Sequence, residues 1–300
     1  MKNLLTAVTL LASLAAPAAR AAAAQTLPEV YGHRGARAVS PENTLAGFRE
    51  AIRAGARAIE FDLNVTKDGA LLIAHDQAVD PVICLGPGGK ALAKGPAIRE
   101  LTLKEAQAFD CGALANPKFP RQKPSPGERM PTVEELFSMV LTSTEPAAGS
   151  LEFDVEAKSV PGSPGLAPAP EDFARLIVDA IDRFKLEERC IVKSFDQRVI
   201  LAVKKLKPGI RTSLLTSDNN LDFVAAVRGA KADILSPDSL WITPEQVAEL
   251  HGAGIKVMPW TVNDPREWQR MVDYRVDAII TDDPAGLAAF LKGADQRPGR

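Results

Sequence analysis

The sequence predicts an α/β protein with the (β/α)8 TIM-barrel fold, on three observations. First, short β-rich runs alternate with amphipathic stretches, as eight parallel strands and their intervening helices require. Second, helix start signals lie between the runs: residues 243–246 (TPEQ) form a capping box with an early proline, and Asp264-Pro265 repeats that start. Third, 300 residues, 46% of them hydrophobic, suffice for one large barrel. A doubly wound open sheet, or two ordinary domains, is the alternative.

The eight β-rich runs are spread over most of the chain. In order they are EVYGH (29–33), AIEFDLN (58–64), SLEFDVEA (150–157), CIVKS (190–194), IRTSLL (210–215), ADILS (232–236), IKVMPW (255–260) and DAIIT (277–281).

An export signal is predicted over residues 1–24. Lys2 is followed by an apolar run from Leu4 to Ala19, and small residues at 19–24 offer a cleavage site. A membrane anchor, the alternative, needs about 20 apolar residues. We therefore expect a periplasmic or secreted protein without stable membrane insertion, whose mature chain, residues 25–300, forms one domain.

Residues 77–130 interrupt the alternation after the second predicted strand. This segment is too rich in Gly, Pro and charge for a strand-helix unit, so we expect a lid-like insertion folded over the barrel mouth. It contains Cys84 and Cys111, and an exported protein can keep a disulfide. Pairing of these two cysteines is favoured, with free thiols as the alternative, whereas Cys190 fits a small buried residue.

Polar side chains stand near the ends of the first three predicted strands, where barrel enzymes carry their chemistry. His33 ends the first strand, Glu60 and Asp62 share one face of the second, and Glu156 and Lys158 share one face of the third. These groups are expected to converge.

The inward carboxylates of Glu60, Asp62 and Glu156 need a partner, because buried unpaired charge is costly. One hard divalent cation with oxygen ligands satisfies all three. The alternative is salt bridging to Arg57, Lys67 or Lys158 on a solvated face. Spacing alone leaves the third ligand open, since Glu152 and Asp154 point the same way as Glu156.

Several motifs together resemble the glycerophosphodiester phosphodiesterase family, in particular its periplasmic branch. They are HRG (33–35), PENT (41–44), ExD (60–62), TKDG (66–69), HD (75–76), EAK (156–158), SF (194–195), WTVN (260–263) and TDDP (281–284). The resemblance implies a (β/α)8 barrel, with histidines at 33 and 75 as general acid and base and with Ca²⁺ or Mg²⁺ on the three carboxylates. It also favours Glu156 as the third ligand.

The same resemblance implies that Arg34 and Lys158 contact the phosphate and that Phe195 and Trp260 line a glycerol pocket. Taken singly, either aromatic residue is also compatible with plain barrel core. The residues PENT begin a helix, with Asn43 or Ser40 as its expected cap and Glu42 beside Arg34. The third histidine, His251, is expected near a helix C-terminus.

Charge and proton transfer support the same chemistry. Three carboxylates, a divalent ion, Arg34 and Lys158 sum to +1, which suits a phosphodiester monoanion, and the arginine fork can hold two phosphate oxygens. Two histidines titrating near neutrality can take one proton and give another. The mature chain keeps 34 basic and 38 acidic residues, so nothing favours a nucleic-acid partner.

We therefore expect metal-dependent hydrolysis of small glycerophosphodiesters to sn-glycerol 3-phosphate and an alcohol. Two alternatives remain: a phospholipase D-like activity on lysolipids, which requires an apolar rim at the barrel mouth, and non-catalytic capture of a phosphate. Intact His33 and His75 argue against capture, which needs only the cation, Arg34 and Lys158. The sequence leaves open the oligomeric state and the role of each histidine.

Overall fold

The computed structural model describes residues 26–218 and 222–295, so the predicted export signal over residues 1–24 lies outside the described residues. Within the described part of the chain, no helix is long and apolar enough to span a bilayer.

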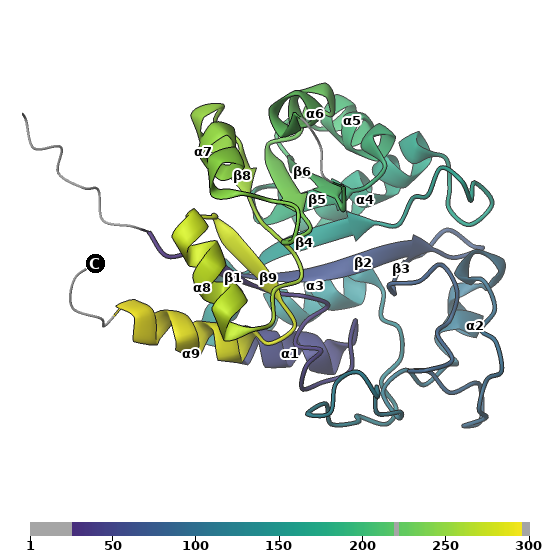
Figure 1. Ribbon diagram of the computed structural model, residues 1–300. Helices are drawn as coiled ribbons and strands as arrows, with labels where there is room; N and C mark the ends of the chain where they lie inside the picture. The colour runs from purple at the N-terminus through teal and green to yellow at the C-terminus, as the bar shows by residue number, and fades with distance from the viewer. Residues whose placement is uncertain (1–25, 219–221, 296–300) are drawn as a thin grey trace, which may run out of the picture.

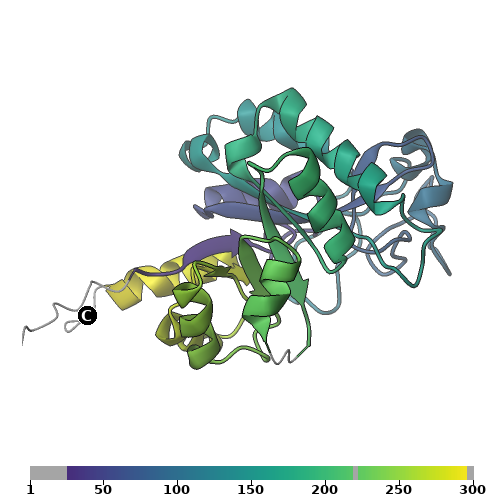
Figure 2. The same cartoon turned by 90° about the horizontal axis from the view of Figure 1, so that it is seen from above.

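Eight parallel strands form a barrel with helices around it, as predicted (Figures 1 and 2). Their order around the sheet is β8-β7-β6-β5-β4-β2-β1-β9, and backbone bonds from Asp277 N to Val257 O (2.9 Å) and from Ile280 N to Pro259 O (3.1 Å) join its two edges. The strands are β1 (Glu29–Gly32), β2 (Ala58–Val65), β4 (Glu152–Ala157), β5 (Cys190–Ser194), β6 (Arg211–Thr216), β7 (Ile234–Pro237), β8 (Lys256–Val257) and β9 (Ala278–Thr281).

The surrounding helices begin where the sequence places start signals. Thr243 forms the predicted capping box of α7, and Asp264 caps α8 ahead of Pro265. The helices are α1 (Leu45–Arg53), α3 (Val133–Leu141), α4 (Pro170–Phe184), α5 (Gln197–Leu206), α6 (Phe223–Gly229), α7 (Pro244–Gly252), α8 (Pro265–Tyr274) and α9 (Pro284–Asp295).

Strand alternation decides which side chains reach the inside of the barrel. On β2, Ile59, Phe61 and Leu63 pack in the apolar layer under the helices, whereas Ala58 lies in the apolar floor inside the barrel. Glu60 and Asp62 point the same way as Ala58, toward the carboxyl end. The barrel interior is therefore apolar at its amino end and charged at its carboxyl end.

One further strand, β3 (Leu71–Ile73), was not predicted and pairs antiparallel with β2. Three apolar residues behind the TKDG turn are too short a run to stand out in the sequence. The strand matters because it ends two residues before His75 and so carries that side chain to the barrel mouth.

The inserted segment, residues 77–130, lies beside the carboxyl ends of β2 and β3 (Figure 1). It contains the short helices η1 (Ile98–Glu100) and α2 (Leu103–Ala106) and the favoured disulfide between Cys84 and Cys111. Val79, Phe109, Met130 and both cysteines pack with Leu72 of β3 in a small apolar cluster. The segment is thus a compact addition to the barrel.

Candidate active and metal site

Three buried carboxylates meet at the carboxyl ends of β2 and β4. Asp62 lies opposite Glu156 in the parallel register, and one oxygen each of Glu60, Asp62 and Glu156 lies within 4.8 Å of the others. Asp62 Oδ1 is buried and accepts no hydrogen bond within the described structure. An all-oxygen set with an unsatisfied buried acceptor fits a hard divalent cation, so these residues can bind a metal.

Two lysines accompany the carboxylates. Lys158 Nζ lies 2.7 Å from Glu156 Oε1 and 3.5 Å from Asp62 Oδ1, and Lys193 Nζ lies 3.2 Å from Glu60 Oε1. Burial alone would raise the pKa of Asp62, but the positive charges of Lys158 and Arg34 outweigh it and lower that pKa. Asp62 is therefore ionised at neutral pH.

Lys193 is a site residue that the sequence did not single out. It lies inside an apolar run, but the register places it opposite Glu156, and it is only 2% exposed. Its other partner is Asp154, at 2.8 Å. Burial raises the pKa of Asp154 to about 6, although Lys193 opposes that shift.

Glu152 and Asp154 point to the same side of β4 as Glu156 but are not part of the carboxylate triad. Asp154 lies one step deeper in the barrel and pairs with Lys193. Glu152 lies at the amino end of β4, where it pairs with Arg57 at 2.5 Å and Arg211 at 3.0 Å. The structure thus separates the three acids that spacing alone could not.

The HRG turn fixes Arg34 above the carboxylates. Arg34 N donates to Glu60 Oε2 (2.8 Å), while its guanidinium lies 2.6 Å from Glu42 and 3.4 Å from Asp62. The next residue, Gly35, has φ +89°, and a Cβ there would lie 2.7 Å from the backbone of Gly47. Only glycine therefore allows this turn to pack against α1.

His33 is held from one side by Asp282. Its Nδ1 lies 2.7 Å from Asp282 Oδ1, and its Nε2 lies 3.9 Å from Glu60 Oε2. Asp282 also accepts from Arg37 Nε (2.5 Å) and Asn263 Nδ2 (2.7 Å). Burial lowers the pKa of His33 despite the raising effects of Glu60 and Asp282, so the ring is neutral at pH 7.

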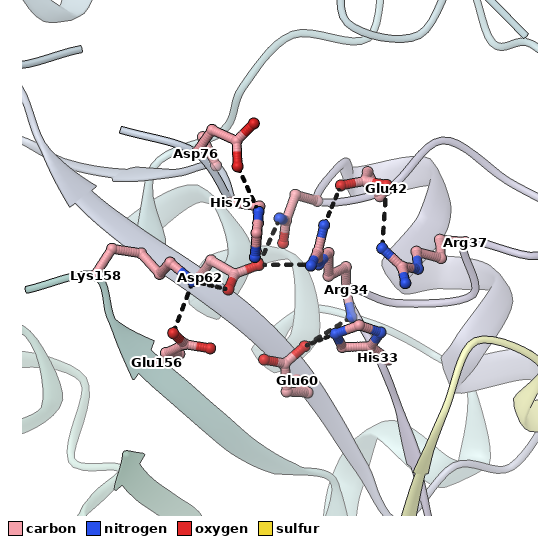
Figure 3. Close-up of polar contacts among 12 residues, drawn as sticks. His33, Arg34, Arg37, Glu42, Glu60, Asp62, His75, Asp76, Glu156 and Lys158 are labelled. Carbon is pink, nitrogen blue, oxygen red and sulfur yellow. Dashed lines mark hydrogen bonds and ion pairs between the residues drawn. The ribbon is translucent and has the colours of Figure 1, made fainter. Parts of the chain in front are cut away.

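His75 follows β3, and its ring lies beside Asp62 and Arg34 (Figure 3). Its Nδ1 lies 2.7 Å from Asp76 Oδ1, so each of the two histidines has an aspartate on Nδ1. Asp76 and Asp282 carry no predicted role, although both lie within motifs visible in the sequence.

A cavity of about 330 Å³ connects these groups. His33, His75, Arg34 and Lys158 line its polar part, and Phe195, Leu215 and Trp260 form an apolar wall. The rings of Phe195 and Trp260 meet edge to face at 5.7 Å, and Trp260 Nε1 donates to Ser236 O. All nine residues singled out from the sequence thus lie in or directly beneath this cavity.

The predicted cap of α1 at Asn43 or Ser40 is wrong. Thr44 caps the helix, because its side chain accepts from Gly47 N. Asn43 instead adopts φ +54° and donates from Nδ2 to Asp62 Oδ2 at 2.9 Å, which orients a carboxylate of the triad. A polar run before a helix offers several possible caps, and only the backbone conformation decides among them.

The third histidine lies outside the site. His251 is in the last turn of α7, as predicted, and its Nε2 lies 2.9 Å from Asp277 Oδ2 near the amino end of the barrel.

Comparisons with known proteins agree with this geometry. The model of the glycerophosphoryl diester phosphodiesterase family matches residues 33–286. The chain belongs to this family. The glycerophosphodiester phosphodiesterase of Caldanaerobacter subterraneus is 34% identical over 88% of this chain and 97% of its own length. These matches confirm the predicted family and enzyme class.

Two solved structures show how closely the fold follows the family. A Silicibacter pomeroyi protein, provisionally named as a glycerophosphoryl diester phosphodiesterase, has a TM-score of 0.83 at 30% identity, covering 89% of this chain and 94% of its own. An Oleispira antarctica phosphodiesterase, solved with its product sn-glycerol-3-phosphate, has a TM-score of 0.74 at 21% identity, covering 89% of this chain and 97% of its own. The second likeness concerns the fold alone.

Proposed function

We propose that this family member hydrolyses glycerophosphodiesters to sn-glycerol 3-phosphate and an alcohol, with one divalent cation and two histidines. The observation that carries the proposal is the cavity in which His33 and His75 lie beside a buried carboxylate triad and the cationic side chains of Arg34 and Lys158. The product bound in the Oleispira relative has the chemistry that this cavity suits.

Glu60, Asp62 and Glu156 hold the cation, which is Ca²⁺ or Mg²⁺. When bound, it supplies positive charge that draws the diester phosphate in and polarises it. With Arg34 and Lys158 the carboxylates and the ion then sum to +1. The pair Lys193–Asp154 adds no charge above a pH of about 6, where Asp154 is ionised, whereas Arg37 with its partners Glu42 and Asp282 adds −1, so this wider set is neutral. Both phosphate-binding side chains stay protonated, because burial lowers their pKa values less than the adjacent carboxylates raise them.

His33 acts as the general base. The neutral ring of His33 donates Nδ1–H to Asp282. Its Nε2 lone pair is then free to take a proton from the nucleophile, which is water or the neighbouring glycerol hydroxyl. This tautomer follows from the carboxylate beside Nδ1, which can only accept. The hydroxyl oxygen of Thr261, which follows Trp260 in the chain, lies 3.4 Å from His33 Nδ1, so His33 adjoins the apolar wall where the glycerol half is proposed to bind.

His75 acts as the general acid. It lies at the border between the catalytic cavity and the inserted segment, on the side from which the alcohol departs. Asp76 on Nδ1 supports the protonated ring, and Nε2 gives the proton to the leaving oxygen. The P–O bond to the head group breaks as that proton arrives.

Lysolipid hydrolysis is a second candidate, because the barrel mouth has an apolar rim. Phe195, Leu240 and Trp241 are 44%, 72% and 46% exposed. Ser239 N donates to Trp260 O, so the loop with Leu240 and Trp241 lies directly beside the apolar wall of the catalytic cavity. An acyl chain on the glycerol could follow this rim.

The protein is further proposed to work outside the cytoplasm, in the periplasm or secreted, as one barrel domain with residues 77–130 as a lid. The Cys84–Cys111 disulfide supports an oxidising compartment.

Turnover assays test these proposals. Purified protein is incubated with glycerophosphocholine, glycerophosphoethanolamine or lysophosphatidylcholine, with EDTA or with added Ca²⁺ or Mg²⁺. We expect glycerol 3-phosphate from the first two substrates only with metal. Faster turnover of the lysolipid would favour the second candidate, and metal-dependent binding without turnover of any substrate would contradict an enzymatic role.

A further inference from the structure

A second cavity, of about 360 Å³, lies between the inserted segment and the HRG turn. Its apolar lining includes Val79, Ile83, Met130 and the Cys84–Cys111 disulfide. Asp80 and Asn116 add polar groups from the same segment. The barrel alone would not form this space, because most of its wall belongs to residues 77–130.

This second cavity shares a wall with the catalytic one. Arg34, Arg37 and His75 line both. A phosphodiester has two organic arms that leave the phosphorus in different directions, so a phosphate held at Arg34 places one arm in each cavity. The arm beside Phe195 and Trp260 is the glycerol half, and the other arm is the head group.

Asp80 gives the second cavity a free negative charge. Its half-buried carboxylate accepts from Val82 N (2.9 Å) and forms no ion pair within the described structure. The other two acids of the lining are already matched, since Glu42 pairs with Arg34 and Asp76 pairs with His75. Lys118 also lines this cavity without an ion pair in the described structure, but its side chain is exposed to solvent, so a cationic ligand group would compete only with a solvated lysine for Asp80.

Asn116 shows that this wall also offers an unused donor. The residue is only 8% exposed, and its Oδ1 accepts from Lys118 N at 3.0 Å. Its Nδ2 donates to no group in the described part of the chain. This nitrogen is not fully buried, so it is open to the cavity and can donate to a ligand oxygen or to water held with the ligand.

We propose that this second cavity binds the departing head group and selects alcohols that carry an ammonium, such as choline or ethanolamine. The proposal rests on the proposed function. Asp80 faces the ammonium, the apolar wall covers its methyl or methylene groups, and His75 at the common wall protonates the oxygen that leaves.

Asp80→Asn is the sharpest test, because the amide oxygen can still accept from Val82 N while the charge is lost. We expect kcat/KM for glycerophosphocholine and glycerophosphoethanolamine to fall about five-fold, mostly through KM, as for one half-buried ion pair. Glycerophosphoglycerol, whose head group is uncharged, should change less than about two-fold. The control variant Glu100→Gln removes an exposed charge from the same segment outside the cavity. It should leave the ratios of kcat/KM among the three diesters unchanged.

A second variant tests the cavity by size. Ile83→Phe narrows it and should reduce kcat/KM for glycerophosphocholine more than for a diester with a methanol head group. Equal losses on all head groups in both variants would overturn the proposal. If wild type hydrolyses every diester but Asp80→Asn keeps the wild-type preference, only the head-group site fails. If wild type hydrolyses none, the proposed function fails with it.

Discussion

Asp282→Asn is expected to damage catalysis while leaving the fold intact. Asp282 accepts from three donors, His33, Arg37 and Asn263. In the amide, an NH2 group replaces one of the two carboxylate oxygens. In one orientation this NH2 faces the donors of His33 and Arg37, and in the other it faces the donor of Asn263. If that NH2 faces His33, the ring must carry its proton on Nε2 and can no longer act as a base. We expect kcat to fall about 10² to 10⁴-fold, or roughly 2.7 to 5.5 kcal/mol of transition-state stabilisation.

The pH profile distinguishes this effect from a general loss of structure. Burial lowers the pKa of His33 and Asp282 opposes that shift, so its loss should lower the pKa further. The acid limb of kcat/KM should therefore move to lower pH in the variant while the plateau drops. Asp283→Asn, which removes the neighbouring carboxylate paired with Arg121, is the matched control and should leave the limb in place.

Steady-state rates on glycerophosphocholine from pH 4 to 9, with thermal melts of each variant, provide the assay. An Asp282→Asn enzyme within about three-fold of wild type, with an unmoved acid limb, would refute the assignment of Asp282 as the group that orients His33.

Three further outcomes follow from the structure. Asp62→Asn should weaken metal affinity and activity together, with the rate partly restored at high metal; unchanged metal dependence in a titration would exclude this carboxylate as a ligand. The Cys84–Cys111 bridge closes a loop of 27 residues, so its reduction should lower the free energy of unfolding by about 3.5 kcal/mol in the chain-entropy model. The denaturant midpoint should fall in reductant, and an equal midpoint would refute this. Burial alone would raise the pKa of Asp196, but hydrogen bonds from Arg198 and Ser159 outweigh it and lower that pKa. The ionised carboxylate therefore stabilises the folded protein above about pH 4, and this contribution is lost as the pH falls further. Asp196→Asn should therefore be about 1 kcal/mol less stable at pH 7, with a smaller gap at pH 3.5, and a gap that stays constant in urea unfolding would contradict the sign.

The barrel was predictable because its signals are local. Each parallel strand is a short apolar run, and the caps at Thr243 and Asp264 mark helix starts without reference to the rest of the chain. β3 was missed because three residues carry too little pattern, and its pairing with β2 depends on a turn at Gly69 with φ +86°. The wall that residues 77–130 build around the second cavity depends on long-range packing, which no periodicity encodes.

The site was predictable where motif and strand parity agree, as at Glu60 and Asp62. Lys193 was missed because a lysine within an apolar run carries no sign that it faces two carboxylates, and only the register of β4 with β5 shows it. Asp282 lies about 250 residues from His33 in the chain, a separation that only barrel closure bridges. In the proposed mechanism, this long-range partner orients His33.

The central claim is that His33 and His75 each transfer a proton, and leaving-group dependence tests it most directly. The assay measures His33→Ala and His75→Ala on glycerophosphocholine and on the 4-nitrophenyl diester of glycerol 3-phosphate, whose leaving group needs no proton. We predict that both variants lose about 10² to 10⁴-fold on glycerophosphocholine, and that His75→Ala alone recovers to within about ten-fold of wild type on the nitrophenyl diester. Rescue of His33→Ala instead would exchange the two roles. Turnover of glycerophosphocholine within a few-fold of wild type by both variants would contradict two-histidine catalysis altogether.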